Sequence, residues 1–163
     1  IWLGINLITA LLASWFIGLF EATLETVVAL AVLMPVVASM GGIAGSQTLA
    51  LIIRGLALGQ VNETNAKILL DKEFKVGLAS GVIWSIAIAV VASFWFDSYM
   101  IGLVIALAIL VNIITASVSG LLVPMALKRL NFDPALSGAV ILTTITDIVG
   151  FVVFLGLGTL LLV

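Results

Sequence analysis

Hydrophobic residues run along this chain in long stretches that short polar segments separate. Five stretches of about 20–30 residues contain no charged side chain, apart from one Asp in the last. A helix needs about 20 apolar residues to cross a bilayer, so each stretch is long enough to span one. The pattern predicts an all-α integral membrane protein with five transmembrane helices. The predicted spans are about 1–20, 26–53, 76–96, 98–127 and 134–163.

The charged residues between the spans predict how the chain is oriented. Five crossings place the connections after the second and fourth spans on one side of the membrane. These connections hold all six basic residues, namely Arg54, Lys67, Lys72, Lys75, Lys128 and Arg129. The other two connections hold only Glu21, Glu25 and Asp97. The positive-inside rule therefore predicts a cytoplasmic N-terminus and a C-terminus outside.

Composition agrees with a membrane domain and argues against several enzyme classes. The chain is 64% hydrophobic and 9% charged, whereas soluble domains carry about 25% charged residues. It contains no Cys and no His, so it lacks thiolate chemistry and the commonest general base. No Lys lies inside a span to activate a serine, and only one carboxylate does, whereas an aspartyl protease needs two. We expect no enzymatic activity, and we interpret the sequence as part of a longer protein.

That one carboxylate, Asp147, is the first candidate functional residue. A charged side chain at the centre of a bilayer costs about 2.5–3.5 kcal/mol on insertion scales, so it is expected to face water, a cation or a partner. Thr143, Asp147 and Gly150 share one helix face at positions i, i+4 and i+7, and Thr144 and Thr146 add oxygen atoms. Oxygen ligands suit Mg²⁺, Ca²⁺ or Mn²⁺. The alternative is an Asp that neighbouring Thr hydroxyls satisfy, or one that is protonated and only packed.

The second span contains a glycine-rich segment with two possible functions. Gly41, Gly42 and Gly45 are followed by the polar residues Ser46 and Gln47. Such a segment either lines a pore or lets helices pack closely through small residues. The sequence alone leaves both interpretations open.

Further polar residues are candidates. Glu21 and Glu25 are spaced i, i+4 and would form an acidic outer vestibule that concentrates cations. The alternative is that they are ordinary solvated charges. Hydrogen bonds between helices are expected from four residues of the fourth span, Asn112, Thr115, Ser117 and Ser119. The alternative for Asn112 is a function in the pore.

Several motifs follow one another along the chain, namely Phe20-Glu21-Ala22-Thr23-Leu24-Glu25, Pro35-Val36-Val37, Gly41-Gly42-x-x-Gly45-x-Gln47, Arg54-Gly55-Leu56-Ala57-x-Gly59 and Asp133-Pro134-Ala135 with Thr143-Thr144-x-Thr146-Asp147. In order and spacing they resemble the transmembrane domain of the MgtE family of Mg²⁺ channels, over essentially all 163 residues. One departure is Ile43, where many members have Asn.

The resemblance implies that residues 1–163 form an ion-conducting domain of a homodimer in the plasma (inner) membrane. Its cation pore would lie between the protomers and be lined by the second and fifth spans, with Gly41, Gly42 and Gly45 on the pore side. Asp147 would be the central carboxylate, and backbone oxygens near Thr143 and Gly150 would help to hold a hydrated ion. Cytoplasmic regulatory domains would precede the first span, outside this sequence.

We therefore expect a channel that conducts hydrated Mg²⁺, with membrane lipid and a second copy as partners and no nucleic acid. Mn²⁺ or Ca²⁺ would suit the same oxygen atoms. The first alternative is a transporter coupled to H⁺ or Na⁺, in which Asp147 is protonated during the cycle. The second is a non-transporting scaffold that assembles through its glycine faces.

Overall fold

The computed structural model describes residues 1–163, and all of its regular secondary structure is helical. The helices are α1 (Trp2–Gly18), α2 (Glu21–Thr26), α3 (Val28–Ala57), α4 (Ala66–Trp95), α5 (Tyr99–Arg129) and α6 (Pro134–Leu162). Four of them, α3 to α6, are long and apolar enough to cross a membrane. This confirms an all-helical, multi-pass membrane protein. α1 is apolar but has only 17 residues, the lower limit for a span, so the fifth crossing stays a prediction.

α4 extends beyond the predicted third span. The apolar stretch predicts a span from residue 76, whereas the helix begins at Ala66; the limit of the span itself stays a prediction. The charged residues that marked the end of the apolar stretch belong to the first turns of this helix, where Lys75 and Asp71 form an i, i+4 ion pair of 2.6 Å. Charges mark where a helix leaves the hydrocarbon, and the helix itself continues beyond that point. The connection between α3 and α4 is correspondingly shorter than the sequence suggested.

Local capping explains where α5 and α6 begin. The carboxylate of Asp133 accepts a hydrogen bond from the backbone N–H of Ala135 at 2.9 Å, and Pro134 is the first helical residue. Ser98 caps α5 in the same way, by accepting from the N–H of Ile101. Asp and Ser side chains satisfy N–H groups that have no partner in the first turn.

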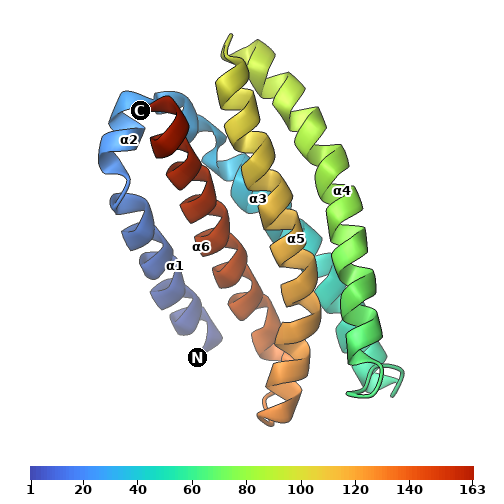
Figure 1. Cartoon of the computed structure of the whole chain (residues 1–163). Coiled ribbons are helices and arrows are strands. Elements are labelled where there is room, and N and C mark those ends of the chain that lie inside the picture. The colour runs from blue at the N-terminus through green and yellow to red at the C-terminus, as the bar shows by residue number, and fades with distance from the viewer.

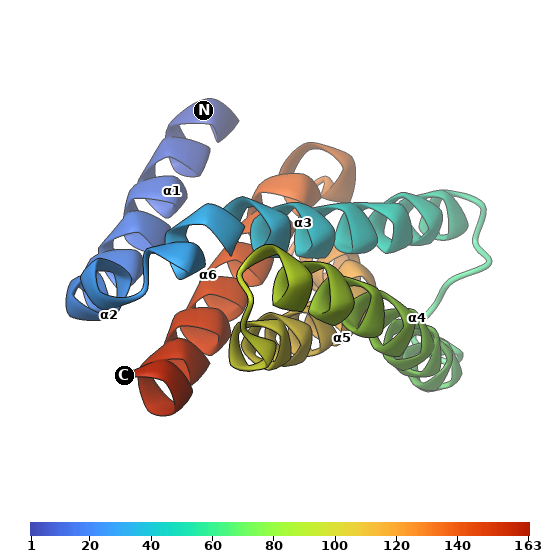
Figure 2. The same cartoon turned by 90° about the horizontal axis from the view of Figure 1, so that it is seen from above.

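α5 is the central helix. It packs against α3, α4 and α6, and α3 also packs against α6. α4 contacts mainly α5, and α1 contacts mainly α6, so these two helices lie on opposite sides of the bundle (Figure 2). The largest hydrophobic core brings together side chains of α3, α5 and α6, including Val37, Ile109 and Phe154.

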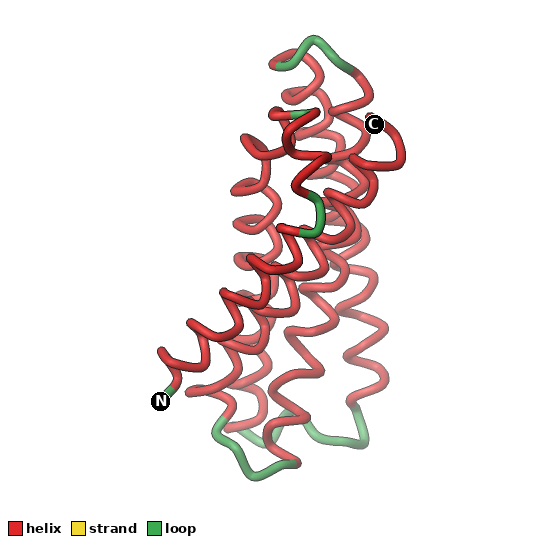
Figure 3. Tube along the Cα trace, turned by 90° about the vertical axis from the view of Figure 1, so that its left-hand side faces the viewer, coloured by secondary structure: helices red, strands yellow, loops and turns green.

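The chain reverses direction at each connection, so the connections gather at the two ends of the bundle (Figures 1 and 3). The N-terminus, the α3–α4 connection and the α5–α6 connection lie at one end. α2, the α4–α5 turn and the C-terminus lie at the other end. The basic residues therefore gather toward the end that carries the N-terminus, and Glu21, Glu25 and Asp97 lie at the opposite end. Which end faces the cytoplasm stays a prediction.

Candidate cation site on helices α3 and α6

Asp147 lies near the middle of α6, and the residue is partly exposed at the surface of the bundle. It is the only charged residue in the stretch 134–163. No hydrogen bond within the chain reaches its carboxylate, and both ion pairs of the structure lie elsewhere, near the basic end. A carboxylate in this position is available to a cation, to water or to a second copy of the chain.

The neighbouring threonine hydroxyls bond to the backbone of α6 and not to Asp147. Thr143 donates to the carbonyls of Ala139 and Val140, at 3.0 and 3.1 Å. Thr144 donates to the Val140 carbonyl at 2.7 Å. These contacts argue against the alternative in which neighbouring threonine hydroxyls donate hydrogen bonds to the Asp147 carboxylate. They use the hydroxyl protons and leave oxygen lone pairs free, and both Thr143 and Thr144 are partly exposed.

Thr146 and Gly150 lie on the buried face of α6. Thr146 is fully buried, and its hydroxyl donates to the Thr143 carbonyl at 3.1 Å. Gly150 packs against Asn112, whose Nδ2 would lie 2.6 Å from a Cβ atom at this position. The expected ligand function of these two residues stays a prediction, and for Gly150 it concerns the backbone carbonyl.

The glycine-rich segment of α3 has two faces. Gly41 and Gly45 are buried: Gly41 packs against Asn112, and a Cβ atom at Gly45 would lie 3.0 Å from the methyl groups of Leu142. Gly42, Ser46 and Gln47 point away from this face and are partly or fully exposed. Helix packing is therefore shown for Gly41 and Gly45. Pore lining by the segment stays a prediction, and it applies most directly to the exposed residues.

Asn112 makes the hydrogen bond between helices that its sequence position predicted. Its Nδ2 donates to the carbonyl oxygen of Val37 on α3 at 3.0 Å, and the side chain is fully buried. The bond joins the central helix to α3, one turn before Gly41 along the same helix. For Thr115 the same prediction is wrong, because its hydroxyl donates to the Val111 carbonyl of its own helix at 2.8 Å.

A groove of about 600 Å³ between α3 and α4 contains the carboxylate of Glu73, a residue that precedes the predicted third span. Glu73 of α4 is partly buried there and accepts a hydrogen bond from Thr48 of α3 at 3.2 Å. Gln47 also lines this groove. Helical spacing could have indicated that Glu73 is partly buried, because it lies four residues before Gly77 and therefore on the same helix face. That face packs against α5.

The two acidic residues of the predicted outer vestibule lie on α2, and both are exposed. Between them, Thr23 is buried and shares a 2.7 Å hydrogen bond with the hydroxyl of Thr159, near the end of α6. This contact fixes Glu21 and Glu25 at the end of the bundle opposite the basic residues. Their function in attracting cations stays a prediction.

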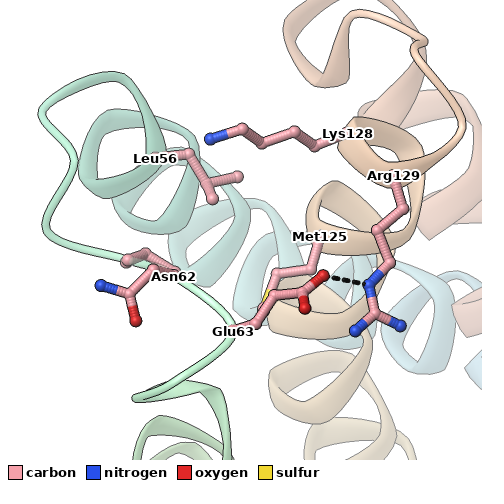
Figure 4. A pocket seen from close by; sticks show the side chains of 7 residues that line it. Leu56, Asn62, Glu63, Met125, Lys128 and Arg129 are labelled. Atoms are coloured by element: carbon pink, nitrogen blue, oxygen red, sulfur yellow. Dashed lines mark hydrogen bonds and ion pairs between the residues drawn. The ribbon is translucent and has the colours of Figure 1, made fainter.

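At the basic end, Glu63 of the α3–α4 connection pairs with Arg129 of α5, at 2.6 Å from Oε1 to Nε (Figure 4). The hydrogen bond from Arg129, together with its positive charge, lowers the pKa of Glu63 below its ordinary value of 4.5. The pair borders a cavity of about 290 Å³ between the connection and α5. This contact holds two of the connections predicted to be cytoplasmic close together.

Within the chain, no three Asp, Glu, His or Cys side chains gather in a cluster that would hold a metal ion. Asp147 is the only acidic residue in the apolar stretch of α6. A second acidic ligand beside it would have to come from outside this chain.

Comparison with known proteins identifies similar sequences. The MgtE family model, described as a divalent cation transporter, matches residues 34–157. The magnesium transporter MgtE of Bacillus subtilis is 34% identical over 158 residues, which is 97% of this chain and 35% of that protein. That of Thermus thermophilus is 32% identical over 162 residues, or 99% of this chain and 36% of that protein. The chain thus spans about a third of the length of these relatives.

Proposed function

The chain belongs to the MgtE family of divalent cation transporters, and from this premise we propose that it conducts Mg²⁺ through a pore between two copies of the chain, centred on Asp147. The observation that carries the proposal is the Asp147 carboxylate, which lies at mid-helix in an apolar stretch, partly exposed, with no hydrogen bond from its own chain. The dimer is what the family resemblance implies, and the mechanism is argued from the chemistry of the side chains.

Two-fold symmetry would supply the charge that one protomer lacks. An isologous dimer presents the same surface twice, so a single Asp147 becomes two carboxylates on either side of the axis. Close carboxylates repel one another, and a divalent cation between them neutralises both charges. The site would therefore favour a doubly charged ion over a singly charged one.

The proposed site would hold Mg²⁺ with its water still attached. Mg²⁺ requires octahedral geometry at about 2.0–2.1 Å and loses water reluctantly. Removing the whole hydration shell would create a high barrier. The Asp147 carboxylates and the oxygen atoms of Thr143 and Thr144 would instead accept hydrogen bonds from the bound water molecules, which keeps the ion mobile.

The exposed face of α3 would form the other wall of the path. Gly42 is small and Ser46 is polar, so they leave room for hydrated ions without an apolar barrier. Ile43, beside them, is 59% exposed and carries no hydrogen-bonding group. We expect its apolar side chain to weaken water contacts in the inner part of the pore relative to family members that have Asn.

The membrane potential would drive the flux. Each charge gains about 2.3 kcal/mol per 100 mV when it crosses, so an inside-negative potential favours Mg²⁺ entry without a coupled ion. Glu21 and Glu25 would raise the local cation concentration at the outer end.

The test is Mg²⁺ flux into proteoliposomes that contain the full-length protein, with Asp147→Ala compared with Asp97→Asn, an exposed acid in the α4–α5 turn. We expect Asp147→Ala to lose Mg²⁺ flux or selectivity and Asp97→Asn to keep both. Full selectivity in Asp147→Ala would refute the assignment. Flux that requires a proton or Na⁺ gradient would identify the coupled transporter instead of the channel.

A further inference from the structure

We infer that Asn112 is a positioning residue for the cation path: its buried side chain sets the separation of α3 and α6 beside Asp147, and so determines which hydrated cations pass. The inference rests on the proposed function and adds to it a residue that does not line the path. It depends on three observations, which are the slot that the side chain fills, the position of that slot and the chemistry of the amide.

The side chain of Asn112 fills a slot between two glycines. It is fully buried, and its Nδ2 donates to the Val37 carbonyl of α3 at 3.0 Å. A Cβ atom at Gly41 of α3 would overlap this amide, and one at Gly150 of α6 would lie 2.6 Å from Nδ2. Both helices therefore approach α5 closely only because these two positions have no side chain.

The slot lies at the level of the candidate site. Gly150 follows Asp147 by three residues, which is about one helical turn. Gly41 directly precedes Gly42, which lies on the exposed face of α3. α5 packs against three other helices, so Asn112 extends from the central helix of the bundle. Loss of its hydrogen bond to Val37, or a change in the size of residue 112, would therefore move α3 and α6 relative to each other at Asp147.

The amide is not the residue that packing alone would favour. No donor within the chain reaches its Oδ1, although this atom is buried. Burying a polar atom without a partner is unfavourable. A Leu side chain has a similar branched shape and would fill the slot without that cost, but it cannot donate the hydrogen bond that fixes α3 at the Val37 carbonyl. If Asn112 served only to hold the fold together, the Leu variant would be at least as stable and equally functional.

The first experiment compares Asn112→Leu with the wild type, in the full-length protein in proteoliposomes. We expect the thermal midpoint to stay equal or rise, while the ratio of Mg²⁺ to Ca²⁺ flux changes by roughly 3- to 30-fold, the scale seen for changes that act through packed neighbours. An unchanged flux ratio in a stable Asn112→Leu protein would overturn the inference. Absence of any cation flux in the wild type would overturn the proposed function as well, so the two failures are distinguishable.

If the Asn112→Leu variant fails to fold, a pair of compensating size changes at residues 41 and 112 tests the same contact. Gly41→Ala alone is expected to collide with the amide and to reduce both stability and flux. Adding Asn112→Ala makes room for the new methyl group, so the double variant should recover stability and part of the Mg²⁺ flux. The control is Gly156→Ala on α6, where a Cβ atom would meet nothing within 4 Å; it should behave as the wild type. No recovery in the double variant would contradict direct contact as the cause.

Discussion

The hydroxyl of Thr48 on α3 donates a hydrogen bond to the carboxylate of Glu73 on α4 at 3.2 Å, and no other side-chain hydrogen bond joins these two helices. The bond crosses the groove of about 600 Å³ that separates them. Elsewhere α4 is held mainly by its packing on α5. This single polar contact therefore ties α4 to the helix that carries the glycine-rich segment.

Thr48→Val is expected to lower the stability of the protein by about 1 kcal/mol, because it removes a hydrogen bond to a charged group and leaves the partly buried Glu73 without its partner. Thermal unfolding in detergent measures this. The matched control is Thr115→Val, since the Thr115 hydroxyl bonds only to its own helix, at the Val111 carbonyl (2.8 Å). Equal losses in the two variants would show that the contact between helices contributes nothing specific.

Leu142→Ala is expected to destabilise the protein by about 2–5 kcal/mol, the range for truncating a large buried side chain. Leu142 is fully buried and lies against Gly45, so its removal leaves a cavity between α6 and α3. Leu136→Ala, on the same helix but 64% exposed, should change the thermal midpoint little. A small effect at Leu142 would mean that α3 and α6 close over the cavity.

The ion pair between Glu63 and Arg129 predicts a pH dependence at the basic end. The folded pKa of Glu63 is lowered from 4.5, so its stabilising contribution is fully present above about pH 4.5. This contribution is lost as the pH falls through the lowered folded value. The protection factors of residues 58–65 against hydrogen exchange, which correct for the pH dependence of the intrinsic rate, should therefore fall below pH 4.5. In Glu63→Gln the protection should be lower at neutral pH and should lose this acid step; an unchanged acid step would assign it to another group.

The proposed dimer interface can be tested by cross-linking, because the chain has no native Cys. Ser46→Cys places one thiol on the exposed face of α3, and a bismaleimide whose spacer bridges the proposed pore should yield a covalent dimer on a denaturing gel. Ile86→Cys on α4, at a residue that is 60% exposed, should yield little. Dilution with excess lipid separates a stable dimer from chance collisions, and equal yields from both variants would count against this interface.

The orientation predicts which connections are accessible from each side of the membrane. Tyr99→Cys near the α4–α5 turn should react with an impermeant maleimide added to intact cells. Phe132→Cys in the α5–α6 connection should react only after the cells are permeabilised. Both native side chains are exposed, so access to the reagent, and not burial, decides the result. The reverse pattern would place the basic end outside.

Some features could be predicted from local sequence because local physics controls them. Apolar length indicated the four long helices that the structure shows. Asn112 was expected to bond between helices, because a buried amide in an apolar helix finds a partner on a neighbour. The start of α4 could not be predicted in this way, since charge marks the limit of the hydrocarbon and not the end of the helix.

Other features depend on which helices meet. The sequence shows six small or polar residues from Gly41 to Gln47, but only the packing of α3 against α5 and α6 separates buried Gly41 and Gly45 from the more exposed remainder. Glu73 gained its partner only because α3 and α4 lie side by side at Thr48.

By itself, the sequence determined that the chain is a helical membrane protein, where its charges lie, and that Asp147 is the one acid within an apolar span. Those properties follow from composition and from the length of the apolar stretches. Only the tertiary structure decided which side of each helix is buried, that no threonine hydroxyl bonds to Asp147, and that Asn112 separates Gly41 from Gly150. Contacts between residues far apart in the chain depend on how whole helices pack, and no local pattern specifies that packing.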